Sequence, residues 1–546
     1  MPERIDLQHP HPLFDAAATR RIEQAAAAAL PPHALMQRAG LALARLALAL
    51  APHARTVWIA CGPGNNGGDG LEAAMHLMRW GAHPLVTWLG EKARAPADAL
   101  ASLARARAAG VPFTGAPPPD LCPQDLCIDA LLGIGAARAP SGRMAEWLRL
   151  MRAAKATLLA VDVPSGLNAD TGAWLPAHPG PEMPDATDSI AHNQDTTLVN
   201  AQNGSQNAGR HTLTLLTVKP GLFTAHGRDA CGTLWFDDLG TAPANEPPAA
   251  WLNAPPPLPP RPHASHKGSW GDVAIIGGET WPPHSPAAHG ALPPEGALAA
   301  LGRPGGGEGG HAHGLSMTGA ALLAASAALH GGAGRVYVSL LGQDTPMFDA
   351  CQPELMFRRP DALDLARLTA VCGCGGGSAV QGVLPAVLEQ TPRLVLDADA
   401  LNAIAHDLAL QRALRQRAAR GQATVLTPHP LEAARLLDCG VADVQERRLY
   451  AAQKLAARWQ CVAVLKGSGS IIAAPGLPPH INPTGNALLA TPGAGDVLAG
   501  LIGAHLAAGH PAFEAACRAV RQHGATADAW PPGATLTAGQ LARRLA

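Results

Sequence analysis

A glycine-rich loop early in the chain carries polar side chains that could bind an ion. It runs from Cys61 to Gly70 as Cys-Gly-Pro-Gly-Asn-Asn-Gly-Gly-Asp-Gly, between an apolar run and a helical pattern. Consecutive amides at a helix start bind anions. The G-x-G-x-x-G match is weak alone, because glycine-rich first turns are often purely steric. Asn65, Asn66 and Asp69 strengthen it, because a structural turn does not require them.

Two further loops of this kind follow apolar runs, Asp129-Ala-Leu-Leu-Gly-Ile-Gly and Val-Asp162-Val-Pro-Ser165-Gly. In an open parallel sheet, loops at the carboxyl ends of strands meet at the ligand crevice. Asn66, Asp129 and Ser165 offer oxygen atoms that together could chelate a monovalent or divalent cation, and Asp162 could hold ribose hydroxyls. The alternative is that these residues only cap strands and form turns. Three such loops at successive strand ends favour a site.

A second set of polar loops lies near the end of the chain. Thr491–Gly500 is a glycine turn that runs into an apolar helix expected at Val497–Ala508. Free amides at that helix start form an anion hole, and Asp496 could take a proton from a hydroxyl that attacks a phosphoryl group. The alternative is an aspartate that caps its helix. Three polar loops precede this one, at residues 482–486, at 466–470, and at 426–430 with Glu432.

Composition bounds the class of protein. The 546 residues suit two or three domains, and 47% hydrophobic residues exclude wholesale disorder. A net charge of -1 gives no field toward nucleic acid or an anionic membrane, so we expect a small-molecule partner. No apolar stretch would span a bilayer, and the start lacks a signal-peptide core. Ten cysteines without a Cys-x-x-Cys pair fit neither a zinc module nor a disulfide framework and predict a cytoplasmic location.

Short apolar runs alternate with alanine-rich helical patterns, which predicts an α/β protein with two doubly wound domains. We place the domains at residues 1–240 and 263–546. The stretch 241–262 is rich in proline, which removes the amide donors of a regular central strand, so it is the expected linker. Residues 177–210 and 280–315 are expected to be surface insertions. Strands are predicted at 56–60, 85–89, 126–128, 158–163, 212–218, 272–276, 335–339, 370–372, 394–396, 424–426 and 461–465, and helices at 71–80 and 96–109.

The first half of the chain resembles the YjeF amino-terminal domain family, epimerases that interconvert the R and S forms of hydrated NADH and NADPH (NADHX and NADPHX). The resemblance covers most of residues 10–240 and implies a Rossmann-like domain. The carrying motifs are Asn-Asn-Gly-Gly-Asp-Gly70, Asp129-Ala-Leu-Leu-Gly, Asp162-Val-Pro-Ser-Gly166, and Lys219-Pro-Gly221 with Gly227-Arg-Asp229 behind it.

This resemblance implies a potassium ion near Asn66, Asp129 and Ser165. We expect Asp129 to transfer the proton at C6, because a carboxylate beside a cation stays ionised. The hydrate is expected to contact Asn65, Asn66, Gly67, Gly68, Asp69, Gly133, Ile134, Gly135, Ala136, Ala137, Arg138, Ala139 and Asp162.

The second half resembles the ADP-dependent NAD(P)H-hydrate dehydratases of the ribokinase-like superfamily, over most of residues 262–546. Two departures are Cys374, where the family's Gly-Pro-Gly turn has proline, and Leu431, where many members have glycine. The motifs are those of the 426–500 loops together with His266-Lys-Gly268, Gly277-Gly278, Thr318-Gly-Ala320, Gly373-Cys-Gly-Gly-Gly377 and Leu396-Asp-Ala-Asp-Ala-Leu-Asn402.

The dehydratase resemblance implies that phosphate passes from ADP to the C6 hydroxyl, after which elimination restores the nicotinamide ring. Asp496 would be the base, the amides of residues 493–495 the anion hole, and Mg²⁺ would bridge phosphates. The hydrate would contact Ala320, Gly373, Gly375, Gly377, His429 and Asp496, and the nucleotide Lys466, Gly467, Ser468, Gly469, Ser470 and Gly495.

We therefore predict a fused epimerase and dehydratase that forms a homo-oligomer. The main rival is a ribokinase-like vitamin kinase acting on a hydroxymethyl pyrimidine or thiazole. A rival of another class has a first domain that binds ligand or acts as a scaffold without catalysis. The choice of ADP over ATP rests on the resemblance alone.

Overall fold

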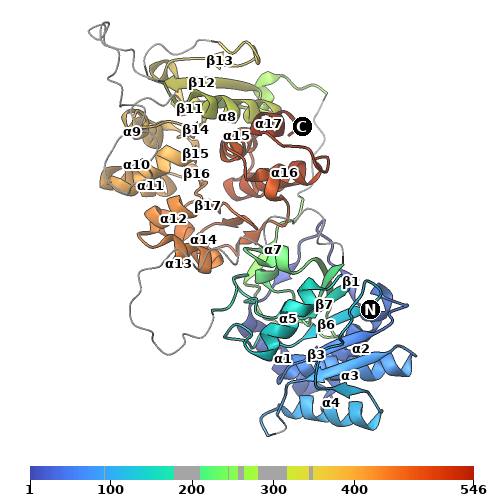
Figure 1. Ribbon diagram of the computed structural model, residues 1–546. Helices are drawn as coiled ribbons and strands as arrows, with labels where there is room; N and C mark the ends of the chain where they lie inside the picture. Colours follow the sequence, from blue (N-terminus) through green and yellow to red (C-terminus); the bar gives the residue numbers. More distant parts are fainter. Residues whose placement is uncertain are drawn as a thin grey trace, which may run out of the picture.

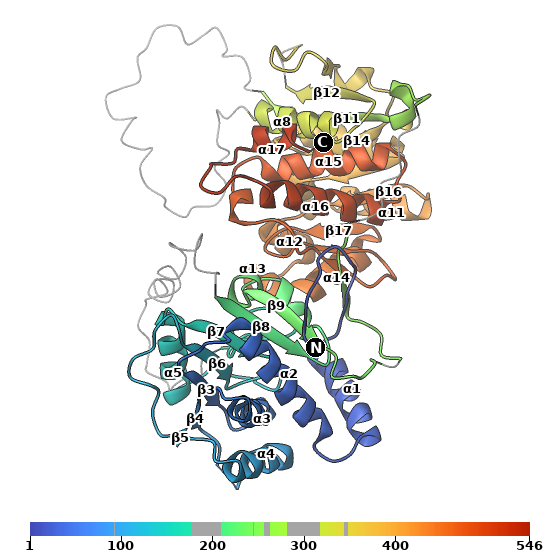
Figure 2. The same ribbon diagram turned by 90° about the vertical axis from the view of Figure 1, so that its right-hand side faces the viewer.

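The computed structural model describes residues 1–91, 93–176, 209–243, 245–255, 263–280, 317–342 and 348–545. Two α/β units lie one above the other, the first coloured blue to green and the second yellow to red in Figure 1 and Figure 2. Most of both predicted insertions, at 177–210 and 280–315, lies outside the described residues, as do residues 256–262 of the predicted linker.

The first unit contains, within the described residues, an eight-stranded sheet in the order β1-β9-β8-β7-β6-β3-β4-β5. All neighbours are parallel except β1, which is antiparallel to β9. The strands are β1 (Glu3–Arg4), β3 (Val57–Cys61), β4 (Pro84–Trp88), β5 (Phe113–Thr114), β6 (Leu126–Ala130), β7 (Thr157–Val161), β8 (Arg210–Leu215) and β9 (Thr233–Asp237), and the helices are α1 (Ala16–Ala29), α2 (Ala34–Leu50), α3 (Asn65–Arg79), α4 (Ala97–Ala108), α5 (Arg143–Ala153) and α7 (Gly227–Ala230).

Strand β3 shows how this sheet is covered on both faces. Its residues alternate in direction, as a strand requires. Val57 and Ile59 join the apolar cluster with α2, α3 and α4. Trp58 faces the other way and packs edge-on against Trp147 of α5, with 6.3 Å between ring centroids. Since both faces are buried, the strand reads as a continuous apolar run in the sequence.

The second unit contains an eleven-stranded sheet among the described residues, in the order β13-β12-β11-β14-β15-β16-β17-β18-β19-β10-β2. The stretch from β13 to β17 is parallel. The strands are β2 (Pro12–Leu13), β10 (Ala250–Leu252), β11 (Asp272–Glu279), β12 (Arg335–Leu341), β13 (Met356–Phe357), β14 (Thr369–Cys372), β15 (Arg393–Leu396), β16 (Ala423–Leu426), β17 (Val462–Leu465), β18 (Ile471–Ala473) and β19 (His480–Ile481), and the helices are α8 (Thr318–His330), α9 (Val380–Gln390), α10 (Ala398–His406), α11 (Leu408–Ala419), α12 (Pro430–Leu437), α13 (Val441–Glu446), α14 (Arg448–Trp459), α15 (Ala494–Ala507), α16 (Ala512–Asp528) and α17 (Ala538–Arg543).

Two strands of this second sheet come from segments that the sequence assigned elsewhere. β10 lies inside the predicted linker, yet it pairs with β19 on one side and with β2 on the other. The expectation that 241–262 contains no central strand is therefore wrong at Ala250–Leu252. The reason is that these three residues lie before the proline run, which starts at Pro255, and keep their amide donors.

The predicted strands are confirmed in both units, with ends that shift by a few residues. The strand expected at 212–218 stops at Leu215, because Leu216 has a left-handed backbone with φ of 65°. Helix α3 begins at Asn65 rather than at Leu71. The polar part of the first glycine loop therefore forms the first turn of the helix.

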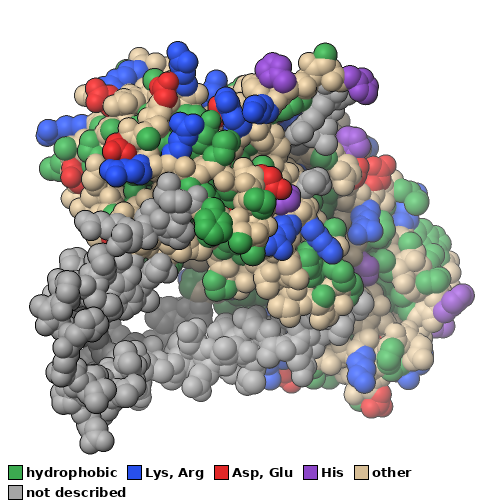
Figure 3. Space-filling model, turned by 90° about the horizontal axis from the view of Figure 1, so that it is seen from above, with side chains coloured by type: hydrophobic (Ala, Val, Ile, Leu, Met, Phe, Trp, Pro, Cys, Tyr) green, Lys and Arg blue, Asp and Glu red, His purple; other side chains and the backbone are tan. Residues whose placement is uncertain are grey.

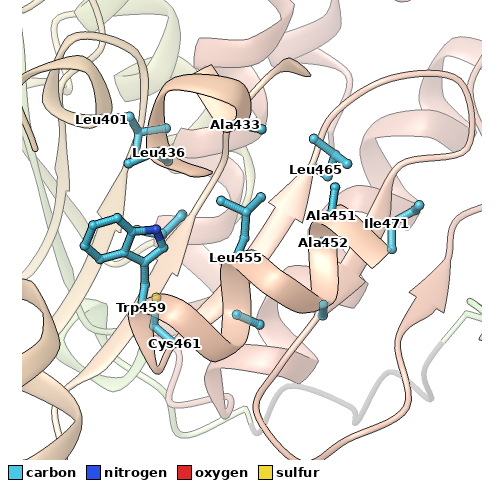
Figure 4. Close-up of a cluster of buried hydrophobic side chains, with 14 of the residues drawn as sticks. Leu401, Ala433, Leu436, Ala451, Ala452, Leu455, Trp459, Cys461, Leu465 and Ile471 are labelled. Carbon is cyan, nitrogen blue, oxygen red and sulfur yellow. The ribbon is translucent and has the colours of Figure 1, made fainter. Parts of the chain in front are cut away.

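The core of the second unit anchors one of the predicted loops. Figure 4 shows Leu455 and Trp459 of α14 packed beside Leu436 of α12. Leu465 and Ile471, which belong to the same buried cluster, stand immediately before and after residues 466–470. Leu222 and Phe223 of the first unit are part of this cluster, so the two units share buried apolar surface.

On the face shown in Figure 3, lysine and arginine side chains are scattered among acidic, apolar and neutral ones. The whole chain carries nearly equal numbers of basic and acidic residues, 41 and 42. Within the described part of the chain, every helix is too short or too polar to cross a membrane.

Candidate functional sites

A cavity of about 620 Å³ opens at the carboxyl ends of the strands in the first unit. It brings together three of the predicted segments, as the convergence of strand ends requires. The predicted residues that line it are Asn65, Asn66, Asp69, Gly133, Ile134, Gly135, Ala136 and Asp162. Gly67 and Gly68 are buried in the first turn of α3, and Ala137, Arg138 and Ala139 continue the lining segment without lining the cavity themselves.

Two glycines allow the loops at this edge to approach closely. A Cβ atom on Gly62 would lie 1.8 Å from the carbonyl oxygen of Leu131, and one on Gly67 would lie 2.1 Å from that of Gly62. Any larger residue at either position would push the loops apart. The glycines thus hold the segment after β6 against the start of α3.

Asp129 and Ser165 lie next to each other behind the cavity. The Ser165 hydroxyl donates to Oδ1 of Asp129 at 2.6 Å, and the Ser165 amide donates to Oδ2 at 3.0 Å. Burial raises the pKa of Asp129, and the hydrogen bonds from Ser165 oppose this shift. Asp129 is absent from the described lining of the cavity. The assignment of proton transfer to Asp129 stays a prediction.

Asn66 lies beside the same loop. The Ser165 hydroxyl accepts a hydrogen bond from the Leu132 amide, and Asn66 Oδ1 is next to Gly133. The side-chain nitrogen of Asn66 is buried without a hydrogen-bond partner. Oxygen atoms of Asn66, Asp129 and Ser165 are hard donors, and a cation among them would supply the positive charge that the buried carboxylate lacks.

The charged groups that face the first cavity include residues that sequence reasoning did not assign. Lys219 is fully buried, forms an ion pair with Asp162, and donates to the carbonyl oxygen of Leu215 at 2.7 Å. Burial raises the pKa of Asp69 well above its usual range, and the charges of Asp162 and Glu23 add to the shift. Lys219 belongs to the Lys219-Pro-Gly221 motif, whereas Glu23 lies in an alanine-rich helix whose sequence does not indicate a site.

In the second unit, three loops bring charged groups together at the carboxyl ends of β15 and β17 and the start of α15. Lys466 Nζ lies 2.8 Å from Oδ1 of Asp397. Gly495 is close to the same ammonium, since its Cβ would lie 3.3 Å away. Asp496 occupies the first turn of α15, and burial raises its pKa to about 7, helped by the charge of Asp397. Asp397 belongs to the Leu396–Asn402 motif, but the sequence analysis assigned it no function.

The predicted hydrate contacts of the second unit surround this cluster. Gly373, Gly375 and Gly377 all have positive φ. A Cβ on Gly375 would lie 2.9 Å from that of Ala320, so the turn lies against the start of α8. His429 caps α12 and accepts hydrogen bonds from the amides of Leu431 and Glu432.

The predicted nucleotide loop, residues 466–470, is held by the first unit. The Ser468 carbonyl oxygen accepts hydrogen bonds from the Ala225 amide at 3.1 Å and from the Thr224 hydroxyl at 3.2 Å. The Ser468 hydroxyl donates to the Ala225 carbonyl oxygen at 2.9 Å. Gly469 has φ of 65°, and its Cβ would lie 2.0 Å from the Phe223 carbonyl oxygen. Ser468 and Gly469 therefore face the first unit, and the segment before α7 touches this loop at the junction in Figure 1.

We expect Thr224→Val to raise the KM for ADP about fivefold to tenfold while kcat changes little. The Thr224 hydroxyl donates to Ser468 and accepts from Nε of Arg448, a buried group that would lose its partner at a cost of about 1 kcal/mol or more. Thr217→Val removes another buried hydroxyl of the same unit, one bonded to Thr19, and should leave this KM unchanged. Equal ADP titration curves for both variants would contradict the prediction.

Two family models match the chain. The model described as YjeF-related protein N-terminus matches residues 32–221, and the one described as NAD(P)H-hydrate dehydratase matches residues 313–546. The bifunctional NAD(P)H-hydrate repair enzyme Nnr of Escherichia coli strain K12 is 33% identical over 95% of this chain and 90% of its own length.

Relatives of the second unit alone are also found. The ADP-dependent (S)-NAD(P)H-hydrate dehydratase of Neisseria meningitidis serogroup B is 39% identical over 52% of this chain and 84% of its own length. Among solved structures, the ADP/ATP-dependent NAD(P)H-hydrate dehydratase of Bacillus subtilis, co-crystallised with ATP and Mg²⁺, is 28% identical with a TM-score of 0.41 and covers 53% of this chain and 92% of that one.

Proposed function

Because the chain belongs to the family of bifunctional NAD(P)H-hydrate repair enzymes, we infer that it restores NADH and NADPH from their hydrates. The first unit epimerises R and S NAD(P)HX. The second dehydrates S-NAD(P)HX to NAD(P)H at the expense of ADP, giving AMP and phosphate. The main support is that a bifunctional relative aligns with both units of this chain. Each unit also has its own cluster of functional groups.

The rival, a vitamin kinase with a non-catalytic first domain, is less supported. Product analysis separates the two. With S-NADPHX, ADP and Mg²⁺, we expect NADPH, AMP and phosphate in equal amounts. Phosphorylation of a hydroxymethyl pyrimidine or thiazole, with the hydrate left unchanged, would support the kinase instead.

We propose that the hydrate binds in the 620 Å³ cavity of the first unit, in contact with the predicted residues that line it. Inversion at C6 needs a base that takes the hydroxyl proton as the C6–N1 bond opens to an aldehyde and the ring nitrogen takes up a proton. The nitrogen then adds to the other face of the aldehyde, it loses that proton, and the hydroxyl oxygen is protonated again. Asp129 lies behind the cavity, whereas Asp162 lines it and is held by the buried Lys219. We therefore assign proton transfer to Asp162 and propose that Asp129 acts through a cation.

The same proposal places a potassium ion at the oxygen atoms of Asn66, Asp129 and Ser165. The chemistry of these donors and the buried carboxylate of Asp129 support the assignment. When bound, the ion supplies positive charge beside the cavity. Asp129 and Ser165 would orient the segment after β6, because the Leu132 amide donates to the Ser165 hydroxyl.

In the second unit, we propose that Asp496 accepts the proton of the C6 hydroxyl as its oxygen attacks the β-phosphorus of ADP. The bond from this phosphorus to the bridging oxygen breaks, and AMP leaves. The C6–O bond then breaks, phosphate departs with the electron pair, and loss of a proton from C5 restores the double bond. Amides of residues 493–495, at the start of α15, would stabilise charge on the transferred phosphate.

We propose that the hydrate contacts Ala320, Gly373, Gly375, Gly377 and His429, and that the nucleotide contacts Gly467, Ser470 and Gly495 with Lys466 near its phosphates. Ser468 and Gly469 would act by holding the loop, because they contact the first unit. Mg²⁺, when bound to the phosphate oxygens, neutralises their charge.

The rate of dehydration should depend on pH through Asp496. Its pKa is raised to about 7 by burial first and then by Asp397, so the basic form predominates above that pH. We expect kcat/KM to fall about tenfold per pH unit below 7 and to level off above it. The measurement is the initial rate of NADPH formation from S-NADPHX between pH 5 and 9, less an enzyme-free blank.

A second group titrates in the same range and provides the control. Burial raises the pKa of Glu432 to about 7 as well. If Asp496 sets the profile, Glu432→Gln keeps its shape. A flat profile in the wild type, or one that flattens in Glu432→Gln, would overturn the assignment.

We also propose that the chain works in the cytoplasm as a homo-oligomer, on small molecules and without nucleic acid or membrane. The domain limits 1–240 and 263–546 remain our proposal, except that β2 and β10 pair within the second sheet.

A further inference from the structure

Cys374 lies in a cluster of three possible metal ligands, of which the proposed reaction uses only Asp496. Its sulfur and one carboxylate oxygen each of Asp397 and Asp496 all lie within 4.8 Å of one another. The three residues come from different elements: the turn after β14, the end of β15, and the first turn of α15. The Cys374 sulfur is 4.0 Å from Oδ2 of Asp397.

The charges around this sulfur suit a divalent cation. Lys466 binds Oδ1 of Asp397 and leaves Oδ2 directed toward Cys374. Lys466 pairs with Asp397, and Asp496 has no salt bridge among the described residues, so its carboxylate can accept a cation. Cys374 is fully buried, whereas Asp496 is half-buried and gives access from solvent.

The donor set selects the type of cation. One sulfur and two carboxylate oxygens fit the tetrahedral preference of Zn²⁺, Cd²⁺ or Co²⁺ and leave a fourth position for water or a phosphate oxygen. K⁺ and Mg²⁺ prefer oxygen ligands only.

We propose that Cys374, Asp397 and Asp496 form a binding site for a thiophilic divalent cation, and that its occupation stops dehydration. A metal–sulfur bond forms, and the proton of the thiol passes to solvent. The bound cation occupies the Asp496 carboxylate and prevents it from accepting the substrate proton. This inhibitory part rests on the proposed role of Asp496, whereas metal binding itself does not.

The binding test is a titration of the full-length protein with Co²⁺, free of nucleotide, followed by thiolate-to-cobalt charge-transfer absorption. We expect a saturable band that Zn²⁺ abolishes and excess Mg²⁺ does not. Cys374→Ser and Cys374→Ala should weaken binding by about tenfold or more, because a ligand is lost. Melting temperatures show whether each variant is folded.

The matched control is Cys372→Ala. Cys372 is also buried and lies two residues earlier in β14, outside the cluster. This variant should keep the wild-type band. An unchanged band in both folded Cys374 variants, or no band in the wild type, would overturn the proposal.

The functional test adds Zn²⁺ to dehydration assays with Mg²⁺ and ADP in excess. Zn²⁺ should lower the dehydration rate of the wild type at least about tenfold relative to its rate without added Zn²⁺. Cys374→Ser should need about tenfold more Zn²⁺ for the same relative decrease. Equal sensitivity of the two would overturn the inhibitory role. Thiol-dependent Co²⁺ binding in a protein without dehydratase activity would sink the proposed function and leave the metal site standing.

Discussion

Asp496→Asn should lower the kcat for dehydration by about a hundredfold to ten-thousandfold, the range typical of a lost general base. An amide at this position keeps the size and the helix start but cannot accept the hydroxyl proton. Burial favours the neutral form of Asp496, so the loss of its charge should cost little stability. Single-turnover formation of NADPH from S-NADPHX measures the effect.

The control for this substitution is Asp443→Asn, which also removes a charge from the first turn of a helix. Asp443 is exposed on α13, and among the described contacts its side chain bonds only to the Gly440 amide. We expect wild-type rates for this variant. Asp496→Asn with more than about a tenth of the wild-type rate would show that another group accepts the proton.

Asp162→Asn should stop the repair of R-NAD(P)HX. It lines the first cavity and pairs with the buried Lys219, so the amide removes both the proton acceptor and the partner of the ammonium. We expect epimerisation to slow by about a hundredfold or more. With a balanced mixture of hydrates, NADPH should then reach only about half of the total when spontaneous epimerisation is slow.

Stability has to be separated from chemistry in this variant. Asp125→Asn breaks another ion pair of the same unit, between the buried Asp125 and the exposed Arg55, neither of which lines the cavity. It should lower the melting temperature without affecting epimerisation. If Asp162→Asn still recovers both hydrates at the wild-type rate while Asp129→Asn does not, proton transfer belongs to Asp129 as the sequence suggested.

Much of the fold follows from local patterns. Runs such as Leu394–Leu396 are apolar because parallel strands are buried on both faces, so the sequence marks them directly. β2 and β10 could not be found in this way. They have two and three residues and carry no alternation. β10 exists because it pairs with β19 and β2 because it pairs with β10, and in each pair the partners lie more than 200 residues apart in the chain.

The sites were predictable to the extent that they lie in glycine loops at strand ends. Asn66 and Asp162 line the first cavity, and Asp496 lies in the first turn of α15. Whether a residue lines a cavity depends on packing depth, which spacing does not encode. From the sequence we assigned proton transfer to Asp129 and ribose binding to Asp162, whereas in the structure Asp162 lines the cavity and Asp129 is absent from its described lining.

The contacts between the two units could not be predicted from the sequence either. Thr224 follows a quoted motif but carries no pattern that would predict a hydrogen bond to Ser468, 244 residues later. Glu23 reaches the first cavity from α1, a helix whose composition is typical of a structural element.

The central claim is that two sites on one chain act in succession on the two epimers. The most direct test follows the absorbance of reduced nicotinamide when wild-type protein meets a balanced mixture of R and S NADPHX, with Mg²⁺, K⁺ and ADP. The account predicts complete recovery of NADPH that depends on ADP. Recovery that halts near one half in the wild type would contradict the epimerase assignment, and recovery without nucleotide, or none at all, would contradict the dehydratase assignment.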